Sequence, residues 1–393
     1  MVLPVGIPKE IKTGERRVSL TPAGVQKLCR QNIPVYVEKN AGLLSSFSDE
    51  DYKRSGAVIL NDRKELWKKA ELIKKVKEPI PDEFELFRPE HLIFTYLHLA
   101  SPSERPLIEA LKRSKVTAIA YETIEQNGEF KLLAPMSEIA GVLAACFSGI
   151  FKNVISVSGK NISGMEQAKV KMVELAAQYP AVPKNLPAGN VLILGGGHVG
   201  EGAARTASRM GSAVTLSELS GARREALRQK FSAEDKKGTG LKTCPLDVRI
   251  IDPKDQNVYE AALVSSDVVI AAVHVGGKRA PIIVDSALLE KISAKKKKII
   301  LDISIDQGGN VAGSRPTDYE TPLYLDSFGN LRFSVTNIPS LCGKGASLAL
   351  ERVSLDYTMA LAQGLELSLN RYPELKTGIN IWNGKVVHPA LDA

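Results

Sequence analysis

A glycine-rich hexapeptide in the middle of the chain constrains the fold more than any other feature. Gly195, Gly197 and Gly200 form a G-x-G-x-x-G pattern. The pattern directly follows the apolar run 190–194 and opens a stretch with helical periodicity, and Glu218 ends the next strand-like run, 23 positions after Gly195. Glycines in this context let backbone N–H groups and a helix N-terminus approach a pyrophosphate, while the acidic side chain accepts hydrogen bonds from a ribose. The motif predicts a Rossmann-type site that favours NAD over NADP, because a carboxylate repels a 2′-phosphate. The alternative is a glycine-rich turn beside a solvated glutamate.

Short apolar runs alternate with amphipathic stretches along the chain, which predicts an α/β protein with parallel sheets. A length of 393 residues is enough for two or three domains. Two segments, Ser101–Glu104 and Ser163–Glu166, have the spacing of capping boxes that open helices. Strands are expected at 4–7, 35–37, 70–77, 92–97, 116–120, 190–194, 213–216, 267–273 and 298–303, and helices at 22–30, 137–150, 164–177 and 346–365.

Composition and charge exclude several classes of protein. The net charge is +8, but the one tight basic run, Lys295–Lys298, leads into an apolar strand and has no interleaved aromatic residues, so no nucleic-acid partner is expected. No apolar run approaches the roughly 18 residues that span a bilayer, and the N-terminus lacks the pattern of a signal peptide. The four cysteines (Cys29, Cys146, Cys244 and Cys342) lie far apart. We therefore expect a cytoplasmic protein with no structural metal and no disulfide framework.

Three polar residues follow strands in the first third of the chain. Lys77 and His98 each end an apolar strand, and Arg17 lies in the loop after the first strand. Ligands of open parallel sheets bind beyond the carboxyl ends of the strands. A lysine and an arginine there suit an α-carboxylate, and a histidine can carry protons near neutral pH. Each has a structural alternative: a solvated lysine in a lysine-rich stretch, a hydrogen-bonded strand-end histidine, and a surface ion pair.

Other candidates lie in the second half of the chain. Asp306 follows the strand 298–303 and precedes two glycines, which places it where it can face a bound cofactor, although the same pattern forms an Asx turn. His274 follows another strand and could flank the cofactor. His198 lies inside the glycine-rich loop, where its backbone matters more than its ring.

Motifs over almost the whole chain, in the same order, resemble the family of alanine dehydrogenases and nicotinamide nucleotide transhydrogenase α-subunits. Several of them are closer to alanine dehydrogenase than to the transhydrogenase branch. The segments that carry the resemblance are 6–10, 15–18, 21–22, 75–79, 97–100, 120–123, 134–138, 306–309, 313–317 and 337–339.

The resemblance implies two Rossmann-like, doubly wound parallel-sheet domains joined by hinge helices. The substrate domain would be discontinuous, with residues 1–135 and 345–393, and the NAD-binding domain would comprise residues 136–344. The implied reaction is the NAD-dependent, reversible oxidative deamination of a small L-amino acid, L-alanine in this family, to pyruvate and ammonia. Family members are commonly homo-oligomers, as dimers or hexamers.

The resemblance also implies roles for single residues. Arg17 and Lys77 would bind the substrate carboxylate, His98 would be the acid/base, and Asp306 would assist at the catalytic centre. No metal is implied. The NAD site would be lined by Ser137, Gly195, Gly197, His198, Val199, Gly200, Glu218, His274, Val275, Asn337 and Ile338.

Two other functions stay open from the sequence. One is a different amino- or imino-acid dehydrogenase on the same scaffold, such as a saccharopine dehydrogenase. The other is a non-catalytic NAD-binding module, which would need only the glycine loop and not Lys77, His98 and Asp306. The segment 150–190 departs from the family pattern, because a longer capped helix replaces its usual glycine-rich loop.

Overall fold

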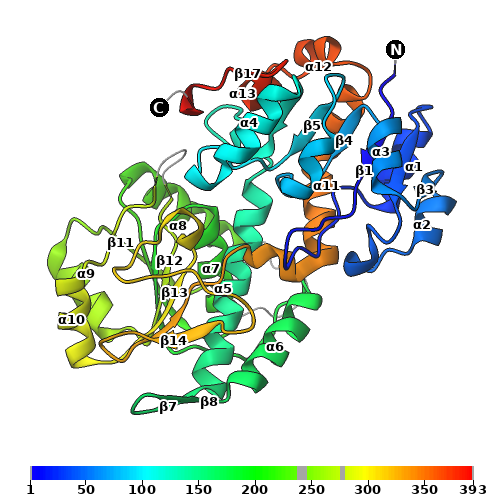
Figure 1. The fold of residues 1–393 in the computed structure, drawn as a ribbon. Helices are drawn as coiled ribbons and strands as arrows, with labels where there is room; N and C mark the ends of the chain where they lie inside the picture. The colour runs from blue at the N-terminus through cyan, green and yellow to red at the C-terminus, as the bar shows by residue number, and fades with distance from the viewer. Residues whose placement is uncertain (1, 237–245, 275–278, 392–393) are drawn as a thin grey trace. The chain divides into compact units, whose positions relative to one another are not determined.

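The computed structural model describes residues 2–236, 246–274 and 279–391. The chain divides into two compact units, which are described separately (Figure 1). Unit 1 comprises Met1–Met136 and Ser340–Ala393, so the C-terminal segment joins the N-terminal one. Unit 2 comprises Ser137–Pro339.

Unit 1 contains an eight-stranded sheet in the order β17-β16-β6-β5-β4-β1-β2-β3. Strands β1 to β6 run parallel, and β16 and β17 extend the sheet antiparallel beyond β6. The winding direction reverses between β1 and β4, where a doubly wound sheet opens a crevice at its carboxyl edge. The bounds are β1 (Val5–Ile7), β2 (Val35–Glu38), β3 (Val58–Leu60), β4 (Leu72–Lys74), β5 (Leu92–Thr95), β6 (Thr117–Ala120), β16 (Ile379–Trp382) and β17 (Lys385–Val386).

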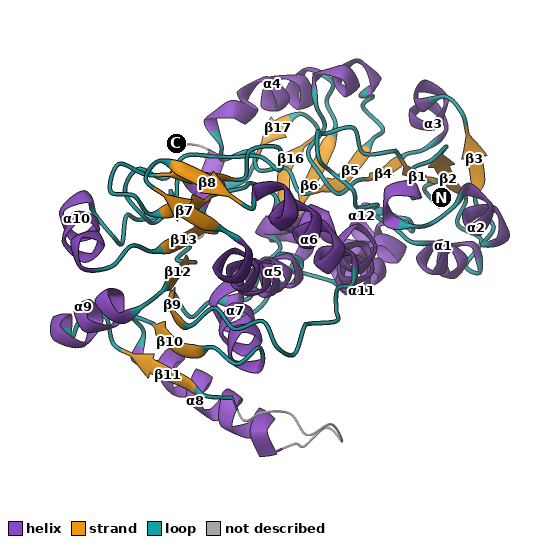
Figure 2. Cartoon of the chain, turned by 90° about the horizontal axis from the view of Figure 1, so that it is seen from below, coloured by secondary structure: helices purple, strands orange, loops and turns teal. Residues whose placement is uncertain are grey.

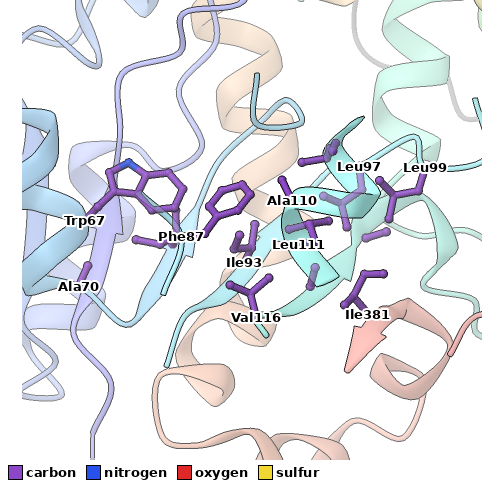
Figure 3. Packing of buried hydrophobic residues seen from close by; sticks show 14 of the residues in the cluster. Trp67, Ala70, Phe87, Ile93, Leu97, Leu99, Ala110, Leu111, Val116 and Ile381 are labelled. Atoms are coloured by element: carbon purple, nitrogen blue, oxygen red, sulfur yellow. The ribbon is translucent and has the colours of Figure 1, made fainter. Parts of the chain in front are cut away.

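The strand residues of unit 1 alternate between two buried faces. Ile73 and Ile93 contribute to an apolar cluster that also contains Trp67 and Leu111 (Figure 3). The next residue of β4, Lys74, points to the opposite face, because successive side chains of a strand alternate. The helices of unit 1 are α1 (Pro22–Cys29), α2 (Asp49–Arg54), α3 (Arg63–Lys69), α4 (Arg105–Arg113), α11 (Gly343–Leu361), α12 (Leu365–Arg371) and α13 (Leu375–Gly378).

Unit 2 contains a seven-stranded sheet in the order β11-β10-β9-β12-β13-β15-β14, parallel except for β14. Its winding reverses between β9 and β12. Helices α9 and α10 lie on one side of the strands, and α7 and α5 on the other (Figure 2). The strands are β9 (Asn190–Leu194), β10 (Ala213–Ser217), β11 (Val248–Ile251), β12 (Val268–Ala271), β13 (Ile299–Asp302), β14 (Leu323–Leu325) and β15 (Leu331–Phe333). The helices are α5 (Ala134–Val154), α6 (Met165–Ala177), α7 (His198–Arg209), α8 (Gly221–Lys236), α9 (Gln256–Ser265) and α10 (Ser286–Lys295). The predicted α/β class with doubly wound parallel sheets is confirmed.

Both predicted capping boxes are wrong. The Ser101 hydroxyl bonds to that of Ser103, 2.8 Å away, instead of capping a helix, and α4 begins only at Arg105 after a 3₁₀ turn. Helix α6 begins at Met165, one residue later than the capping box predicted, and its N-cap is Gly164, with a positive φ of 82°. Ser163 is not available for capping because it belongs to an unpredicted hairpin of β7 (Ser156–Ser158) and β8 (Asn161–Ser163).

Helix α5 is more apolar than the sequence analysis recognised. Among the described residues it is the one helix whose length and composition would allow it to cross a membrane, but most of it is buried inside the protein. The rings of Phe147 and Phe151 pack against Phe333 of β15, with centroids 5.8 and 5.3 Å apart. Its apolar character is therefore explained by a place in the protein core.

Candidate active site

Unit 1 brings the three sequence-predicted residues of its sheet to one edge. Arg17 follows β1, Lys77 follows β4 and His98 follows β5, and these strands are neighbours at the reversal point. The Lys77 Nζ atom lies 3.2 Å from His98 Nε2. Arg17 and Lys77 are buried, whereas His98 is exposed. Two cations and an imidazole therefore share the carboxyl edge of this sheet, where doubly wound folds bind ligands.

Protein atoms surround the His98 ring, although the residue as a whole is exposed, and this environment together with nearby positive charge keeps the imidazole neutral. Loss of hydration around the ring, followed by the charges of Lys77, Lys12 and Arg17, lowers the pKa of His98 well below its usual value. An ammonium group has donors only, so Lys77 donates to Nε2, and we assign the proton of the ring to Nδ1. A neutral imidazole with an accepting Nε2 is the form that can act as a base.

The sequence analysis missed Glu122, which holds the backbone of His98. His98 has a left-handed φ of 52°, which is uncommon for a residue with a side chain. The Glu122 carboxylate accepts hydrogen bonds from the backbone N–H groups of His98, at 2.6 Å, and of Leu97, at 3.1 Å. The ring of His98 stacks on that of Tyr96, with centroids 5.9 Å apart. Glu122 follows β6 at the same sheet edge, which is the one signal that could have identified it.

Several cations near this edge, of which Arg17 and Lys75 are buried, are each paired with a carboxylate. Glu15 holds Arg17 through two side-chain bonds, and Glu78 pairs with Lys12. Lys75 Nζ lies 2.8 Å from Glu83 and 3.3 Å from Glu10. Burial raises the pKa of Glu10, and the charge of Lys75 partly offsets that rise. Such pairing compensates the loss of water around buried charges.

The glycine loop of unit 2 leaves space where a dinucleotide phosphate would lie. A Cβ added at Gly197 would meet no atom within 4 Å, although this residue is the N-cap of α7 and no side chain caps that helix. A Cβ at Gly200 would lie 1.8 Å from the Gly195 carbonyl oxygen, so α7 packs closely on the loop. Gly195 has a φ of +96°. The backbone N–H groups at the start of α7, which no side chain caps, and the space left by the glycine loop fit the binding of a pyrophosphate.

Glu218 lies beside this loop, as predicted. Its two carboxylate oxygens accept hydrogen bonds from the backbone N–H groups of Gly196, at 2.8 Å, and Ser220, at 2.7 Å. Arg223 and Arg224 follow closely in sequence, but Arg223 binds the Gly196 carbonyl and Glu201, while Arg224 binds backbone carbonyls and Asp252. The side chain bonded to the glycine loop is thus the acidic one, which fits NAD because a carboxylate there would repel a 2′-phosphate.

Three of the remaining predicted residues of unit 2 also follow parallel strands. Asp306 follows β13, and its Oδ2 accepts a 3.4 Å hydrogen bond from the backbone N–H of Asn337, which follows β15. His274 follows β12 and is exposed, and burial of part of its ring lowers its pKa. Val275 lies outside the described residues. The others lie in three helical segments: His198 and Val199 open α7, Ser137 is in α5, and Ile338 begins a 3₁₀ turn.

Comparison with known proteins covers both units. The family description "alanine dehydrogenase/PNT, N-terminal domain" matches residues 6–140, and the corresponding C-terminal domain matches residues 143–389. The chain is 37% identical to the alanine dehydrogenase of Bacillus subtilis over 389 residues, which is 98% of this chain and 93% of that protein. It is 35% identical to the alanine dehydrogenase of Methanococcus maripaludis over 390 residues, covering 98% of this chain and 95% of that protein.

The chain belongs to the alanine dehydrogenase/PNT family. The predicted resemblance is thereby confirmed. A solved L-alanine dehydrogenase has a TM-score of 0.81 to this structure, with 33% identity, and the match covers 99% of this chain and 98% of that one. A transhydrogenase from Sinorhizobium meliloti has a TM-score of 0.72 at 20% identity, covering 98% and 99%, and it shows the shared fold alone.

A substitution in the glycine loop can test cofactor binding without disturbing the protein's own packing. Replacing Gly197 with alanine adds a methyl group that touches no protein atom, and the φ of −70° suits alanine. We expect the free energy of unfolding to change by less than about 0.5 kcal/mol. The affinity for NADH, measured by fluorescence titration, should fall at least about tenfold, because the methyl group fills the phosphate position.

Gly200→Ala is the matched comparison for this experiment. Its Cβ collides with the Gly195 carbonyl, so this variant should lose both stability and NADH binding. Undiminished NADH affinity in Gly197→Ala would place the dinucleotide phosphates elsewhere.

Proposed function

We propose that the protein catalyses the NAD-dependent, reversible oxidative deamination of L-alanine to pyruvate and ammonia. The observation that carries this proposal is the His98 imidazole, held 3.2 Å from the Lys77 ammonium at an edge that also contains Arg17. A protein that only bound the dinucleotide would need none of these three groups. The full-length relatives named alanine dehydrogenase support the same reaction.

In the proposed reaction, Arg17 and Lys77 bind the substrate carboxylate, which places Cα and its nitrogen near His98. The glycine loop and Glu218 would hold NAD, which would supply the hydride acceptor for oxidation of the substrate at Cα. His98 takes the proton that leaves the amine and passes it to solvent, and the neutral ring then removes a proton from the water that attacks the resulting imine carbon. Asp306 assists by holding a proton or an ammonium during release of ammonia. In sum, alanine, NAD⁺ and water give pyruvate, ammonium, NADH and a proton.

The proposal assigns a role to each part of the chain. Residues 1–135 and 345–393 act as the substrate domain and residues 136–344 as the NAD-binding domain. We also propose a cytoplasmic homo-oligomer, a dimer or hexamer. Sedimentation of the purified protein, with and without NAD, tests the oligomeric state.

The experiment that tests the function is a substrate panel. The purified protein is mixed with NAD and single L-amino acids, and NADH formation is followed by absorbance; the reverse reaction uses a 2-oxo acid, ammonia and NADH. We expect L-alanine and pyruvate to be the best pair. Turnover of saccharopine, or of another amino acid in preference to alanine, would support the alternative dehydrogenase. Binding of NADH without turnover of any amino acid would indicate a non-catalytic module.

A further inference from the structure

Glu15 and Arg17 form a buried ion pair whose geometry goes beyond simple charge compensation. The carboxylate of Glu15 accepts hydrogen bonds from Arg17 Nε at 2.6 Å and Nη2 at 2.5 Å. It also accepts one from the backbone N–H of Arg17, at 2.9 Å. The side chains are 0% and 3% exposed, respectively. These three hydrogen bonds to one carboxylate fix the conformation of both the side chain and the backbone of Arg17.

This pairing decides which edge of the guanidinium can meet a substrate. A planar guanidinium has two edges that can bind a carboxylate with two parallel bonds. Glu15 occupies the edge formed by Nε and Nη2. The other edge is formed by Nη1 and Nη2, and Nη1 also donates to Met136 Sδ at 3.2 Å, which further defines the plane of the group. A substrate carboxylate is therefore directed to the Nη1–Nη2 edge.

The residues on either side of this pair favour the arrangement. The N–H of Glu15 bonds to the Lys12 carbonyl, 3.0 Å away, and closes a turn that contains Gly14 with a φ of +78°. After the turn, the Val18 N–H bonds to Ser347 Oγ at 2.9 Å. The loop is thus anchored on both sides of Arg17, so the orientation of the guanidinium depends on its own partners rather than on loop position.

We propose that Glu15 is a positioning residue, which acts through Arg17 by presenting the Nη1–Nη2 edge to the carboxylate of the substrate. This inference rests on the proposed function, because it assumes that Arg17 binds that carboxylate. Glu15 itself touches no reacting atom. Without it, the guanidinium would keep its charge but lose its defined orientation, and substrate binding would weaken while the chemical step stays intact.

A double-mutant cycle tests this proposal. The proteins are the wild type, Glu15→Gln, Arg17→Lys and the double variant, and the quantities are kcat and KM for pyruvate, the affinity for NADH and the melting temperature. We expect Glu15→Gln to raise KM for pyruvate about tenfold or more, with kcat changed less than about twofold and NADH affinity unchanged. Because Glu15 acts through Arg17, the double variant should bind pyruvate no more weakly than Arg17→Lys alone.

Additive effects in the cycle would overturn the proposal, as would a loss of kcat and NADH affinity together with pyruvate affinity, since both indicate a general structural role. Glu125→Gln is the matched control, because Glu125 is exposed and only its backbone N–H is bonded. If Glu15→Gln does not fold, the cycle is run with Glu15→Asp, which keeps the charge but is too short for both side-chain bonds.

An equilibrium measurement separates this inference from the proposed function. Pyruvate and oxalate are titrated calorimetrically into each of the four proteins in the presence of NADH. If the wild type binds these anions but does not turn over alanine, the proposed function fails, and the cycle of binding constants still tests Glu15. If binding of both anions is the same in the wild type and Glu15→Gln, Glu15 has no positioning role.

Discussion

Replacing His98 with asparagine should lower turnover of L-alanine by about a thousandfold, the usual range for loss of a general acid/base. Asparagine is chosen because it tolerates the left-handed backbone of this position, φ 52°, better than alanine does. It cannot exchange a proton near neutral pH, so both removal of the amine proton and activation of water are lost. Steady-state kinetics in both directions measures this effect.

The same variant should keep its affinity for NADH, because the glycine loop and Glu218 belong to unit 2 and His98 to unit 1. His388→Asn is the matched control, since His388 lies near the C-terminus, where its Nδ1 accepts only the backbone N–H of Ala390. Turnover of His98→Asn within a few-fold of the wild type would remove His98 from its proposed role. Weak NADH binding would instead show that the substitution acts on the fold.

The largest expected effect on stability comes from Lys74, a buried lysine that the proposed reaction does not use. Its Nζ donates to Tyr121 Oη at 3.0 Å and Ser354 Oγ at 2.9 Å, and the side chain is fully buried. Burial lowers its pKa from 10.5 to about 7, and the negative charge of Glu351 only partly opposes this. Between pH 7 and 10.5 the unfolded chain therefore binds a proton that the folded chain does not bind.

The free energy of unfolding therefore rises with pH between pH 7 and 10.5. As the pH falls towards 7, the neutral Lys74 of the folded protein becomes increasingly unfavourable relative to the protonated lysine of the unfolded chain, and this gain is lost. Each pH unit contributes at most about 1.4 kcal/mol, so the free energy of unfolding should gain about 2 to 3 kcal/mol between pH 7 and 9 from Lys74 alone. Lys74→Met keeps the length of the side chain and removes the charge. At pH 7 it should be about 2 kcal/mol more stable than the wild type, because the relieved burial cost exceeds the two lost hydrogen bonds.

Urea unfolding at pH 7, 8 and 9 measures these differences. Both tryptophans, Trp67 and Trp382, belong to unit 1, so their fluorescence reports the unfolding of the unit that contains Lys74. Lys68→Met, at an exposed position of α3, is the control and should follow the wild type. Parallel pH profiles for the wild type and Lys74→Met would mean that Lys74 does not titrate in this range.

Lys74 also shows where sequence reasoning reaches its limit. Lys74, Lys75 and Lys77 lie in a lysine-rich stretch, for which solvated side chains are the usual interpretation, yet all three are buried. Their carboxylate, hydroxyl and imidazole partners, Glu83, Ser354 and His98 among them, come from elsewhere in the chain. No local pattern reports such pairings, because they depend on which strand and helix are neighbours in space. Glu122 was missed for the same reason, because the backbone groups that it binds are 24 and 25 residues away in sequence.

The two wrong predictions of helix capping have a similar cause. The two serines with capping-box spacing, Ser101 and Ser163, do not cap helices because other partners compete for them: a neighbouring hydroxyl for Ser101 and a hairpin strand for Ser163. A capping motif states which hydrogen bonds are possible, whereas the surrounding structure decides which of them form.

The amino-acid sequence alone determined the α/β class, the glycine loop with Glu218, and the strand ends at which Arg17, Lys77 and His98 stand, because strand periodicity, glycine spacing and helix formation are local properties. Only the tertiary structure decided the order of the strands, which makes β1, β4 and β5 neighbours. It also decided which charges are buried and paired. The physical reason is that the pKa of His98 and the cost of burying Lys74 are set by groups distant in sequence, whose proximity exists only after the sheets are assembled.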